Sequence, residues 1–449
     1  MRLSDIGVLF QSSQLLSQDT VIQGVSIDSR TIKPGELFVA IVGERFDGHN
    51  FVEQAFQQGA CAAIVSHSVE TQYSCPLIQV KDTQEALRQL AIWYRSSLDI
   101  PVLALTGSSG KTTTKEMLAS ILSECYRVFA TPGNKNNHFG VPLSILQCSP
   151  AHEVAVFELG ANHIGEIRSN VKLVKPHAAL ITNVGSAHIG EFGGVEAIFS
   201  AKSEIYEGLE PNGVAIYSQD DAFAGRWRKL LAGRKTLTFG LSSDADISAA
   251  NIVYDELMCT TFELKTPKGT ATVKLSLPGE HNVLNALAAA GLSSTLDIAP
   301  ETIAKGLMQC KGVAGRLVFR KGFQGSQVLD DTYNANLKSI EAAMQVLAGF
   351  AGKRFLVLGD IGELGQWAEE HHRLIGTKAN ELGLDGLFTC GTLSQYANES
   401  FKQIINFHFS DLESLVDTLK KHLDPETIVV VKGSRSSHME NVVSKITIE

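Results

Sequence analysis

The clearest chemical signal in the sequence is a glycine-rich run at residues 106–113, TGSSGKTT. Glycines allow a backbone to wrap closely around a phosphate, and a helix that begins there offers unpaired N–H groups to it. Lys111 would neutralise phosphate charge, and Thr112 would bind Mg²⁺. The strict P-loop pattern has a further glycine six residues before the lysine, where this chain has Leu105. We still predict a phosphate loop, because an apolar strand pattern precedes the run and a helical pattern follows it.

Two later residues have types that suit a metal site. Glu158 ends the apolar run 154–158, and His188 follows the run 178–182 through a loop of small residues. Ligands of open α/β sheets bind at the carboxyl ends of the strands, so both side chains could reach the phosphate loop as magnesium ligands. Lys202 lies in the helical pattern after His188. Because lysine is almost never fully buried without a partner, spacing alone predicts an exposed helix lysine there.

The elements that would position these residues alternate between short β-branched runs and helical patterns. This alternation is typical of parallel sheets covered by helices and predicts an α/β fold. Strands are expected at residues 37–41, 62–65, 101–106, 154–158, 178–182, 327–329, 355–358, 386–389 and 427–431, with strand-rich sequence at 236–277. Helices are expected at residues 51–58, 81–95, 115–125, 195–209 and 282–295.

The 449 residues are long enough for three domains at ~150 residues each. Residues 96–101 suit a linker before a new strand, and the strand pattern restarts beyond residues 315–316. We predict a small N-terminal α/β domain at 1–82, a central parallel-sheet domain that carries the phosphate loop at 83–314, and a C-terminal domain with its own doubly wound sheet at 315–449.

Composition excludes several classes of protein. The formal net charge of −9 offers no general basic surface for nucleic acid. The apolar runs fall far short of the ~20 residues that span a bilayer, and the first residues lack a secretory signal pattern, so we expect a cytoplasmic protein. The seven cysteines are scattered singly, which argues against a disulfide framework or a structural zinc site. We expect all seven to be buried or half-buried packing residues.

Together, these motifs resemble those of the Mur ligases of peptidoglycan synthesis, and they span nearly the whole chain. In order they are TGSSGKTT at 106–113, GNKNN at 133–137, ELG at 158–160, TNVGSAH at 182–188, KSE at 202–204, GEHNVLN at 279–285, GR at 315–316 and DDTYNAN at 330–336. The phosphate loop without the first glycine is that family's own version. Four further runs resemble the branch of the family that adds D-alanyl-D-alanine to UDP-N-acetylmuramoyl-tripeptide. They are DSRTIKPGELF at 28–38, DGH at 47–49, GANH at 160–163 and GDIGELG at 359–365.

The resemblance implies a UDP-binding N-terminal domain, a central ATPase-like domain, a C-terminal Rossmann-like domain, and ATP and Mg²⁺ as cofactors. The residues implied to hold ATP are Gly107, Ser108, Ser109, Gly110, Lys111, Thr112, Thr113, Asn282, Asn285, Arg316 and Asp331. The implied metal ligands are Thr112, Glu158, His188 and Lys202. Catalysis would depend on Lys111, His188 and Lys202. The UDP-sugar substrate would contact Ser29, Arg30, Asp47, His49, Asn134 and Asn137.

Three further positions depend on the resemblance. Lys202 matches the family's carbamylated lysine, a modification that turns a cation into an anionic magnesium ligand. Leu337 stands where the family pattern has proline, so we expect a looser turn there and treat Asn334 and Asn336 as weak candidates. The run KGSRSSH at 432–438 resembles the family's C-terminal loop, although a basic, serine-rich loop is commonly just solvated.

The implied reaction is ligation through an acyl phosphate. Transfer of the ATP γ-phosphoryl group to a peptide carboxylate would activate it for attack by an amine, and such transfer calls mainly for positioning and charge neutralisation. We expect UDP-N-acetylmuramoyl-tripeptide and D-alanyl-D-alanine as substrates, no nucleic acid partner, and a monomer. The alternatives are another Mur-type ligase, a folylpolyglutamate-type ligase, against which residues 28–38 argue, and a regulatory P-loop NTPase that makes no product.

Overall fold

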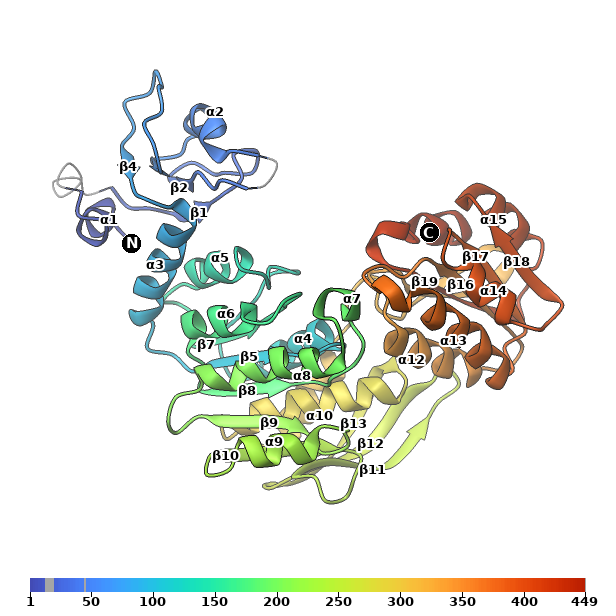
Figure 1. The fold of residues 1–449 in the computed structure, drawn as a ribbon. Coiled ribbons are helices and arrows are strands. Elements are labelled where there is room, and N and C mark those ends of the chain that lie inside the picture. Colours follow the sequence, from blue (N-terminus) through green and yellow to red (C-terminus); the bar gives the residue numbers. More distant parts are fainter. Residues whose placement is uncertain (13–19, 44–45, 449) are drawn as a thin grey trace.

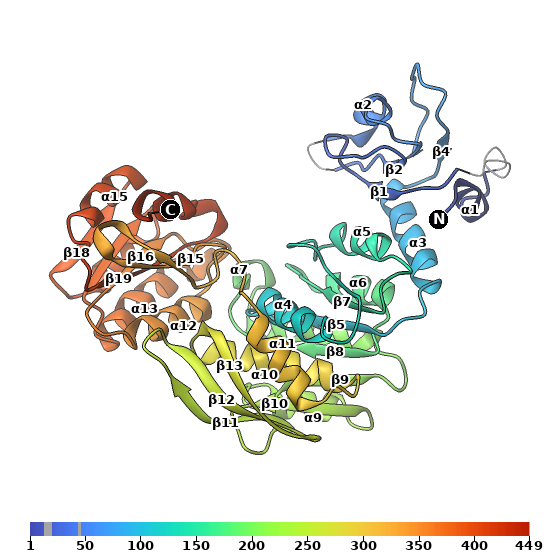
Figure 2. The same cartoon turned by 180° about the vertical axis from the view of Figure 1, so that it is seen from behind.

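The computed structural model of the chain describes residues 1–12, 20–43 and 46–448. The chain forms three lobes, and the N-terminal and C-terminal lobes stand apart on either side of the central one (Figure 1). Each lobe is built on its own sheet. The view from behind shows the same separation and shows helix α3 joining the N-terminal lobe to the central one (Figure 2). No helix among the residues described is long and apolar enough to cross a membrane.

The N-terminal lobe has a four-stranded, all-parallel sheet of order β1-β2-β3-β4. Its elements are α1 (Leu3–Leu9), β1 (Gly24–Ser26), β2 (Glu36–Val39), a 3-10 helix (Gly48–Phe51), α2 (Val52–Gln57), β3 (Ala62–Val65) and β4 (Leu77–Gln79). All four residues of β3 are buried, as the apolar run there predicts. Helix α3 (Thr83–Ser96) begins after Asp82, whose side chain accepts hydrogen bonds from two N–H groups of its first turn.

The central lobe has a nine-stranded sheet of order β13-β12-β11-β10-β9-β8-β5-β7-β6. Its strands are β5 (Val102–Thr106), β6 (Val128–Ala130), β7 (Val154–Glu158), β8 (Ala178–Ile181), β9 (Val214–Ser218), β10 (Lys235–Gly240), β11 (Ile247–Tyr254), β12 (Cys259–Thr266) and β13 (Gly269–Pro278). Its helices are α4 (Lys111–Leu122), α5 (Gly140–Gln147), α6 (Glu166–Val174), α7 (Ile189–Phe192), α8 (Val195–Ser203), α9 (Ala224–Leu230), α10 (Glu280–Ser294) and α11 (Pro300–Gln309), with a 3-10 helix at Glu204–Gly208.

Helices cover both faces of this sheet. Along β5, Leu103 and Leu105 belong to the apolar cluster of α4, α10 and α11, whereas Val102 and Ala104 belong to that of α5, α6 and α8. A strand buried on both faces is apolar throughout, which explains the continuous run in the sequence. The α/β prediction is confirmed, but the sheet is mixed, because β12 pairs antiparallel with both β11 and β13.

The C-terminal lobe has a six-stranded sheet of order β14-β15-β19-β16-β17-β18, in which only the pair β14 and β15 is antiparallel. Its strands are β14 (Val318–Lys321), β15 (Gln327–Asp331), β16 (Lys353–Gly359), β17 (Gly386–Cys390), β18 (Ile405–Phe409) and β19 (Thr427–Lys432). Its helices are α12 (Leu337–Ala348), α13 (Ala368–Glu381), α14 (Gln395–Ser400), α15 (Leu412–Lys420) and α16 (Glu440–Ile446), with 3-10 helices at Phe323–Gly325, Gly365–Trp367 and Arg435–Ser437.

Four expectations require correction. The helix expected at 115–125 begins at Lys111, directly after the glycine loop, and the one expected at 195–209 changes to a 3-10 helix after Ser203. Cys125 is exposed, so not every cysteine is a packing residue. The looser turn expected at Leu337 is absent, because Asn336 and Ser339 form a reciprocal capping box that starts α12 there.

Candidate active site

The topology of the central sheet brings three sequence motifs together. Strand β5 lies between β7 and β8, and all three run parallel. The phosphate loop follows β5, Glu158 ends β7, and the loop that carries His188 follows β8. The carboxyl ends of neighbouring parallel strands share one edge of the sheet, so the three motifs meet there, as predicted. This edge opens into a cavity of about 960 Å³.

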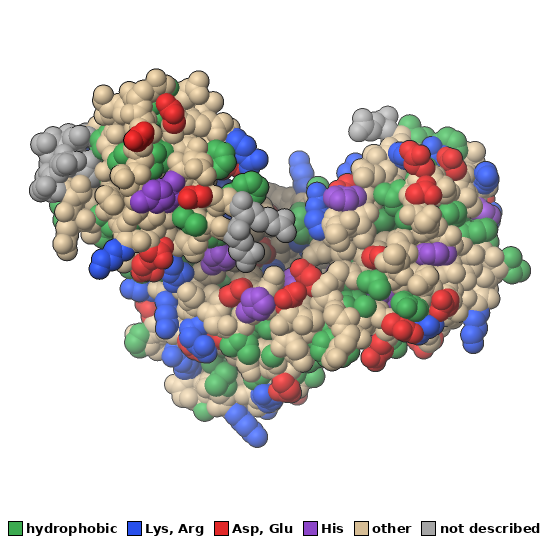
Figure 3. All heavy atoms as spheres, turned by 45° about the horizontal axis from the view of Figure 1, so that its top comes forward, with side chains coloured by type: hydrophobic (Ala, Val, Ile, Leu, Met, Phe, Trp, Pro, Cys, Tyr) green, Lys and Arg blue, Asp and Glu red, His purple; other side chains and the backbone are tan. Residues whose placement is uncertain are grey.

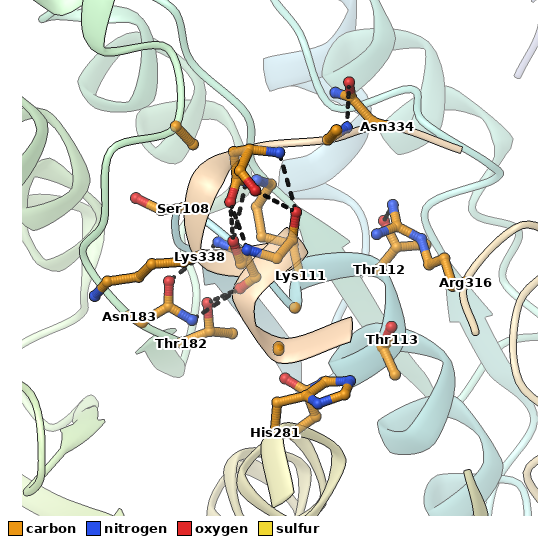
Figure 4. A pocket seen from close by; sticks show the side chains of 18 of the residues that line it. Ser108, Lys111, Thr112, Thr113, Thr182, Asn183, His281, Arg316, Asn334 and Lys338 are labelled. Atoms are coloured by element: carbon orange, nitrogen blue, oxygen red, sulfur yellow. Dashed lines mark hydrogen bonds between the residues drawn. The ribbon is translucent and has the colours of Figure 1, made fainter. Parts of the chain in front are cut away.

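The phosphate loop is packed tightly against the loop after β8. A Cβ on Gly107 would lie 1.9 Å from the hydroxyl oxygen of Thr182, and one on Gly110 would lie 2.2 Å from Oδ1 of Asn285, so both positions require glycine. The Thr182 hydroxyl donates to the Ser109 carbonyl (2.6 Å), and the Ser109 N–H donates to Oδ1 of Asn183 (3.1 Å). These bonds hold the loop at the N-terminus of α4, where its N–H groups suit an anion (Figure 4).

The lysine of this loop is folded back onto it. Lys111 Nζ donates to the carbonyl of Gly107 at 2.8 Å. Burial, together with the nearby Arg316 guanidinium, lowers the pKa of Lys111. A phosphate bound in the cavity would supply a negative counter-charge for this ammonium.

Glu158 is the best-placed cation ligand of the site. Its carboxylate is buried, and Oε1 accepts from Nδ2 of Asn136 (2.7 Å) and from the hydroxyl of Thr112 (3.3 Å). Oε2 is buried without a hydrogen-bond partner among the described residues. A buried, unpaired carboxylate oxygen beside a threonine hydroxyl is the hard oxygen donor set that Mg²⁺ prefers. The side chains present therefore fit the metal that the sequence predicts.

Lys202 is buried, with 1% of its surface exposed, so the exposed helix lysine predicted by spacing alone is wrong. Its Nζ lies 3.5 Å from the carbonyl of Ala161 and over the ring of Phe192. Burial and, after it, the charge of Lys111 lower the pKa of Lys202 to about 7. Such an amine is available for reaction near neutral pH.

The C-terminal lobe contributes a second group of polar side chains to the cavity. The Arg316 guanidinium donates to the Thr112 hydroxyl at 3.1 Å (Figure 4). It also lies over the ring of Tyr333. Asp331 and Lys432 form a buried ion pair at 2.5 Å. Burial raises the pKa of Asp331 in spite of that ion pair. Lys432 therefore lies in the site, and the solvated interpretation of residues 432–438 is wrong for this residue.

Two asparagines of α10 line the cavity, one of them next to Gly110. Asn282 Nδ2 donates to the carbonyl of Pro278 (2.8 Å), and Asn285 Nδ2 donates to Oδ1 of Asn282 (3.1 Å). Oδ1 of Asn285 also accepts from the Thr114 hydroxyl at 3.4 Å. Both asparagines line the cavity, as do the other residues implied to hold ATP apart from Gly107.

The predicted substrate residues divide between two places. Asn134 and Asn137 line the cavity. The four in the N-terminal lobe are not among the residues that line it: Ser29, Arg30, Asp47 and His49. Their lobe faces the hollow that separates it from the C-terminal lobe, and charged side chains and histidines surround that hollow (Figure 3).

The side chains of this N-terminal group largely pair with neighbours in their own lobe. Arg30 forms a bidentate pair with Asp28, and the Ser29 hydroxyl donates to Gln54. His49 uses both ring nitrogens, one on Asp47 and one accepting from the N–H of Ser66. The role of these residues in substrate binding stays a prediction.

Sequence reasoning missed two lysines that support the site. Lys115 is fully buried, and its Nζ donates to the carbonyls of Thr131 (2.7 Å) and Gly133 (3.2 Å), so it holds the loop that carries Asn136. Lys338, in the first turn of α12, donates to the carbonyl of Val184 (2.9 Å). The signals were a lysine one turn after Lys111 and a lysine two residues after a helix cap, and neither distinguishes a buried lysine from an exposed one.

Comparison of the chain with known protein families gives a match in each of the three lobes. Residues 105–293 match the Mur ligase middle domain, residues 315–435 the Mur ligase glutamate ligase domain, and residues 21–95 the Mur ligase family catalytic domain.

Full-length relatives and solved structures agree with this. The UDP-N-acetylmuramoyl-tripeptide–D-alanyl-D-alanine ligase of Escherichia coli is 41% identical over 96% of this chain and 95% of its own length, and that of Bacillus subtilis is 37% identical over 96% and 94%. A crystal structure of MurF from Acinetobacter baumannii has a TM-score of 0.92, with 39% identity over 99% of this chain and 98% of that one. MurF of Thermotoga maritima, in complex with ADP, has a TM-score of 0.85, with 31% identity over 95% and 98%. The chain therefore belongs to the Mur ligase family.

Proposed function

We propose that this protein is the ATP-dependent ligase that joins D-alanyl-D-alanine to UDP-N-acetylmuramoyl-tripeptide in peptidoglycan precursor synthesis. The observation that carries the proposal is identity to ligases of this name along the whole chain, all three lobes included. The cavity that joins the phosphate loop to Arg316 and Asp331 supports ATP as the nucleotide. The alternative of a regulatory P-loop NTPase is not favoured, because such a protein does not need the N-terminal and C-terminal lobes.

The chain's own residues suggest how the reaction is organised. The backbone N–H groups at the start of α4 and the Lys111 ammonium would hold the ATP phosphates, and Arg316 reaches the same place from the C-terminal lobe. These cations would neutralise charge as the γ-phosphoryl group moves to the peptide carboxylate. The acyl phosphate formed would then be attacked by the amine of the dipeptide, with phosphate as the leaving group.

Thr112, Glu158, His188 and Lys202 are the proposed metal ligands. Mg²⁺ held there would add charge neutralisation at the transferring phosphoryl group. The unpaired buried Oε2 of Glu158 supports this assignment. For Lys202, a lowered pKa beside the site supports carbamylation, which would supply two anionic oxygens.

The borders 1–82, 83–314 and 315–449 stand as proposed domains, and each contains one of the three sheets. We place the activity in the cytoplasm, where ATP is available. A monomer suffices, because a single chain carries all the site residues named above.

Product analysis tests the proposal. The protein would be incubated with ATP, Mg²⁺, D-alanyl-D-alanine and UDP-N-acetylmuramoyl-tripeptide, with meso-diaminopimelate or lysine as the third residue. We expect mass spectrometry to show the UDP-linked pentapeptide with at least one of these tripeptides. L-alanyl-L-alanine is the matched control, and glutamate with a folate acceptor tests the folylpolyglutamate alternative. Product from glutamate and folate, with none from the dipeptide, would contradict the proposal.

A further inference from the structure

A further contact between the central and C-terminal lobes lies at the loop that carries His188. It joins the short helix α7 to the loop after β16. The N–H of Gly190 donates to the carbonyl of Glu363 (3.0 Å), and a Glu363 carboxylate oxygen lies 2.6 Å from Nδ1 of His188. A Cβ on Gly190 would lie 2.7 Å from that carbonyl oxygen and 2.8 Å from the N–H nitrogen of Gly365. Only glycine at position 190 permits this approach.

The two residues whose side chains meet here both have an unusual backbone conformation. His188 has φ +58° and Glu363 has φ +61°, a left-handed conformation that residues with a side chain rarely adopt. The surrounding packing holds Glu363 in place, because its neighbours Ile361 and Leu364 are buried. The N–H of Ile361 also donates to Nε2 of His372 (3.1 Å). Two strained residues that face each other across a domain contact point to a functional constraint.

We infer that Glu363 is a positioning residue for His188, supplied by the C-terminal lobe. The charge of a carboxylate oxygen this close to Nδ1 favours the ring proton on that nitrogen and leaves the Nε2 electron pair free to bind a cation, as in the carboxylate–histidine pairs of metal sites. Because Glu363 lies on another lobe, His188 is oriented only when the two lobes are in contact. The inference rests on the proposed metal role of His188.

Magnesium dependence of nucleotide binding tests the inference without turnover. Binding of a non-hydrolysable ATP analogue to the full chain would be measured by calorimetry at a series of Mg²⁺ concentrations, with UDP-tripeptide present. We expect Glu363→Ala to raise the Mg²⁺ concentration for half-maximal binding by about 10–100-fold. Gly190→Ala should raise this Mg²⁺ concentration too, because the added Cβ would push α7 away from the loop that carries Glu363.

Two further variants make the test specific. Glu191→Ala is the matched control, since Glu191 is exposed on the same short helix, and it should leave the Mg²⁺ dependence unchanged. In a His188→Ala background, Glu363→Ala should cause no additional shift, because Glu363 is inferred to act only through His188. Glu363→Gln keeps an acceptor oxygen on a side chain of the same length and should retain part of the wild-type Mg²⁺ affinity. This variant replaces Glu363→Ala in the test if Glu363→Ala does not fold.

An unchanged Mg²⁺ dependence in folded Glu363→Ala would overturn the inference. So would a full additional shift in the His188→Ala background. Failure of the proposed function is separable from both results. A wild-type protein that binds the analogue with Mg²⁺ but makes no pentapeptide would refute the function, while the binding series would still decide the role of Glu363.

Discussion

Replacing Lys202 tests the least expected feature of the site, a buried lysine beside a second lysine. At pH 7 a lysine with the ordinary pKa of 10.5 is only about 0.03% neutral, whereas one with a pKa of about 7 is about half neutral. The site therefore raises the reactive fraction of this amine on the order of 1,000-fold. A neutral amine adds to CO₂, forming an N–C bond and releasing one proton to solvent. The product is the anionic carbamate that we propose as a metal ligand.

We predict that Lys202→Met and Lys202→Ala each lower the ligation rate at least ~100-fold while the protein stays folded, because each removes an anionic group that neutralises charge at the phosphates. Lys229→Ala is the control, because Lys229 is exposed on α9. The assay is phosphate release with both substrates at saturation, and thermal unfolding checks the fold.

Chemical rescue distinguishes a lost carboxylate from general damage. A short carboxylic acid in millimolar amounts should restore part of the activity of Lys202→Ala, because it can occupy the vacated space. The same acid should not restore Lys202→Met, whose side chain fills that space. In the wild-type protein, ¹³C-labelled bicarbonate should give a carbamate signal by NMR that Lys202→Met lacks. Near-normal turnover of Lys202→Ala would refute the reasoning and make this lysine a structural residue only.

Burial also lowers the pKa of His281 to about 4, below the 6.5 of an unfolded histidine. Between these values the unfolded chain binds a proton on this histidine that the folded chain does not, so the free energy of unfolding falls as pH drops from 6.5 to 4, by up to about 3 kcal/mol. Urea unfolding at pH 7 and pH 4.5 should therefore show a smaller loss of stability for His281→Gln than for the wild-type protein. Lys432→Met should cost about 3–5 kcal/mol of stability, because it leaves buried Asp331 unpaired, and adding Asp331→Asn should recover part of that loss in the same assay. Small-angle scattering should show a smaller radius of gyration with ATP analogue and UDP-tripeptide together, because Arg316 joins the lobes at the phosphate loop, and an unchanged radius at saturation would argue against closure.

Features encoded by neighbouring residues could be predicted from the sequence. The buried strand β5 and the glycine loop after it were located, because continuous apolar runs and tight phosphate loops leave local patterns. The meeting of Glu158 with that loop was also predictable, since parallel strands present their carboxyl ends at one edge.

Features that depend on distant segments could not be predicted. The burial of Lys202 depends on the packing of α8 against the loop of Ala161, which spacing along the helix does not encode. The partner of Lys432 lies 101 residues away, and the pairing of His188 with Glu363 joins two lobes. The antiparallel edge of the central sheet follows from pairing of β12 with β11 and β13, and an alternating apolar pattern does not specify strand direction.

The dependence of phosphate release on both substrates tests the central claim most directly. Phosphate would be measured with ATP and Mg²⁺ alone, with UDP-N-acetylmuramoyl-tripeptide, with D-alanyl-D-alanine, and with both. The account predicts sustained release only with both, because the acyl phosphate forms on the tripeptide carboxylate and turns over only when the dipeptide amine attacks it. Sustained release with neither substrate, unchanged when both are added, would contradict it.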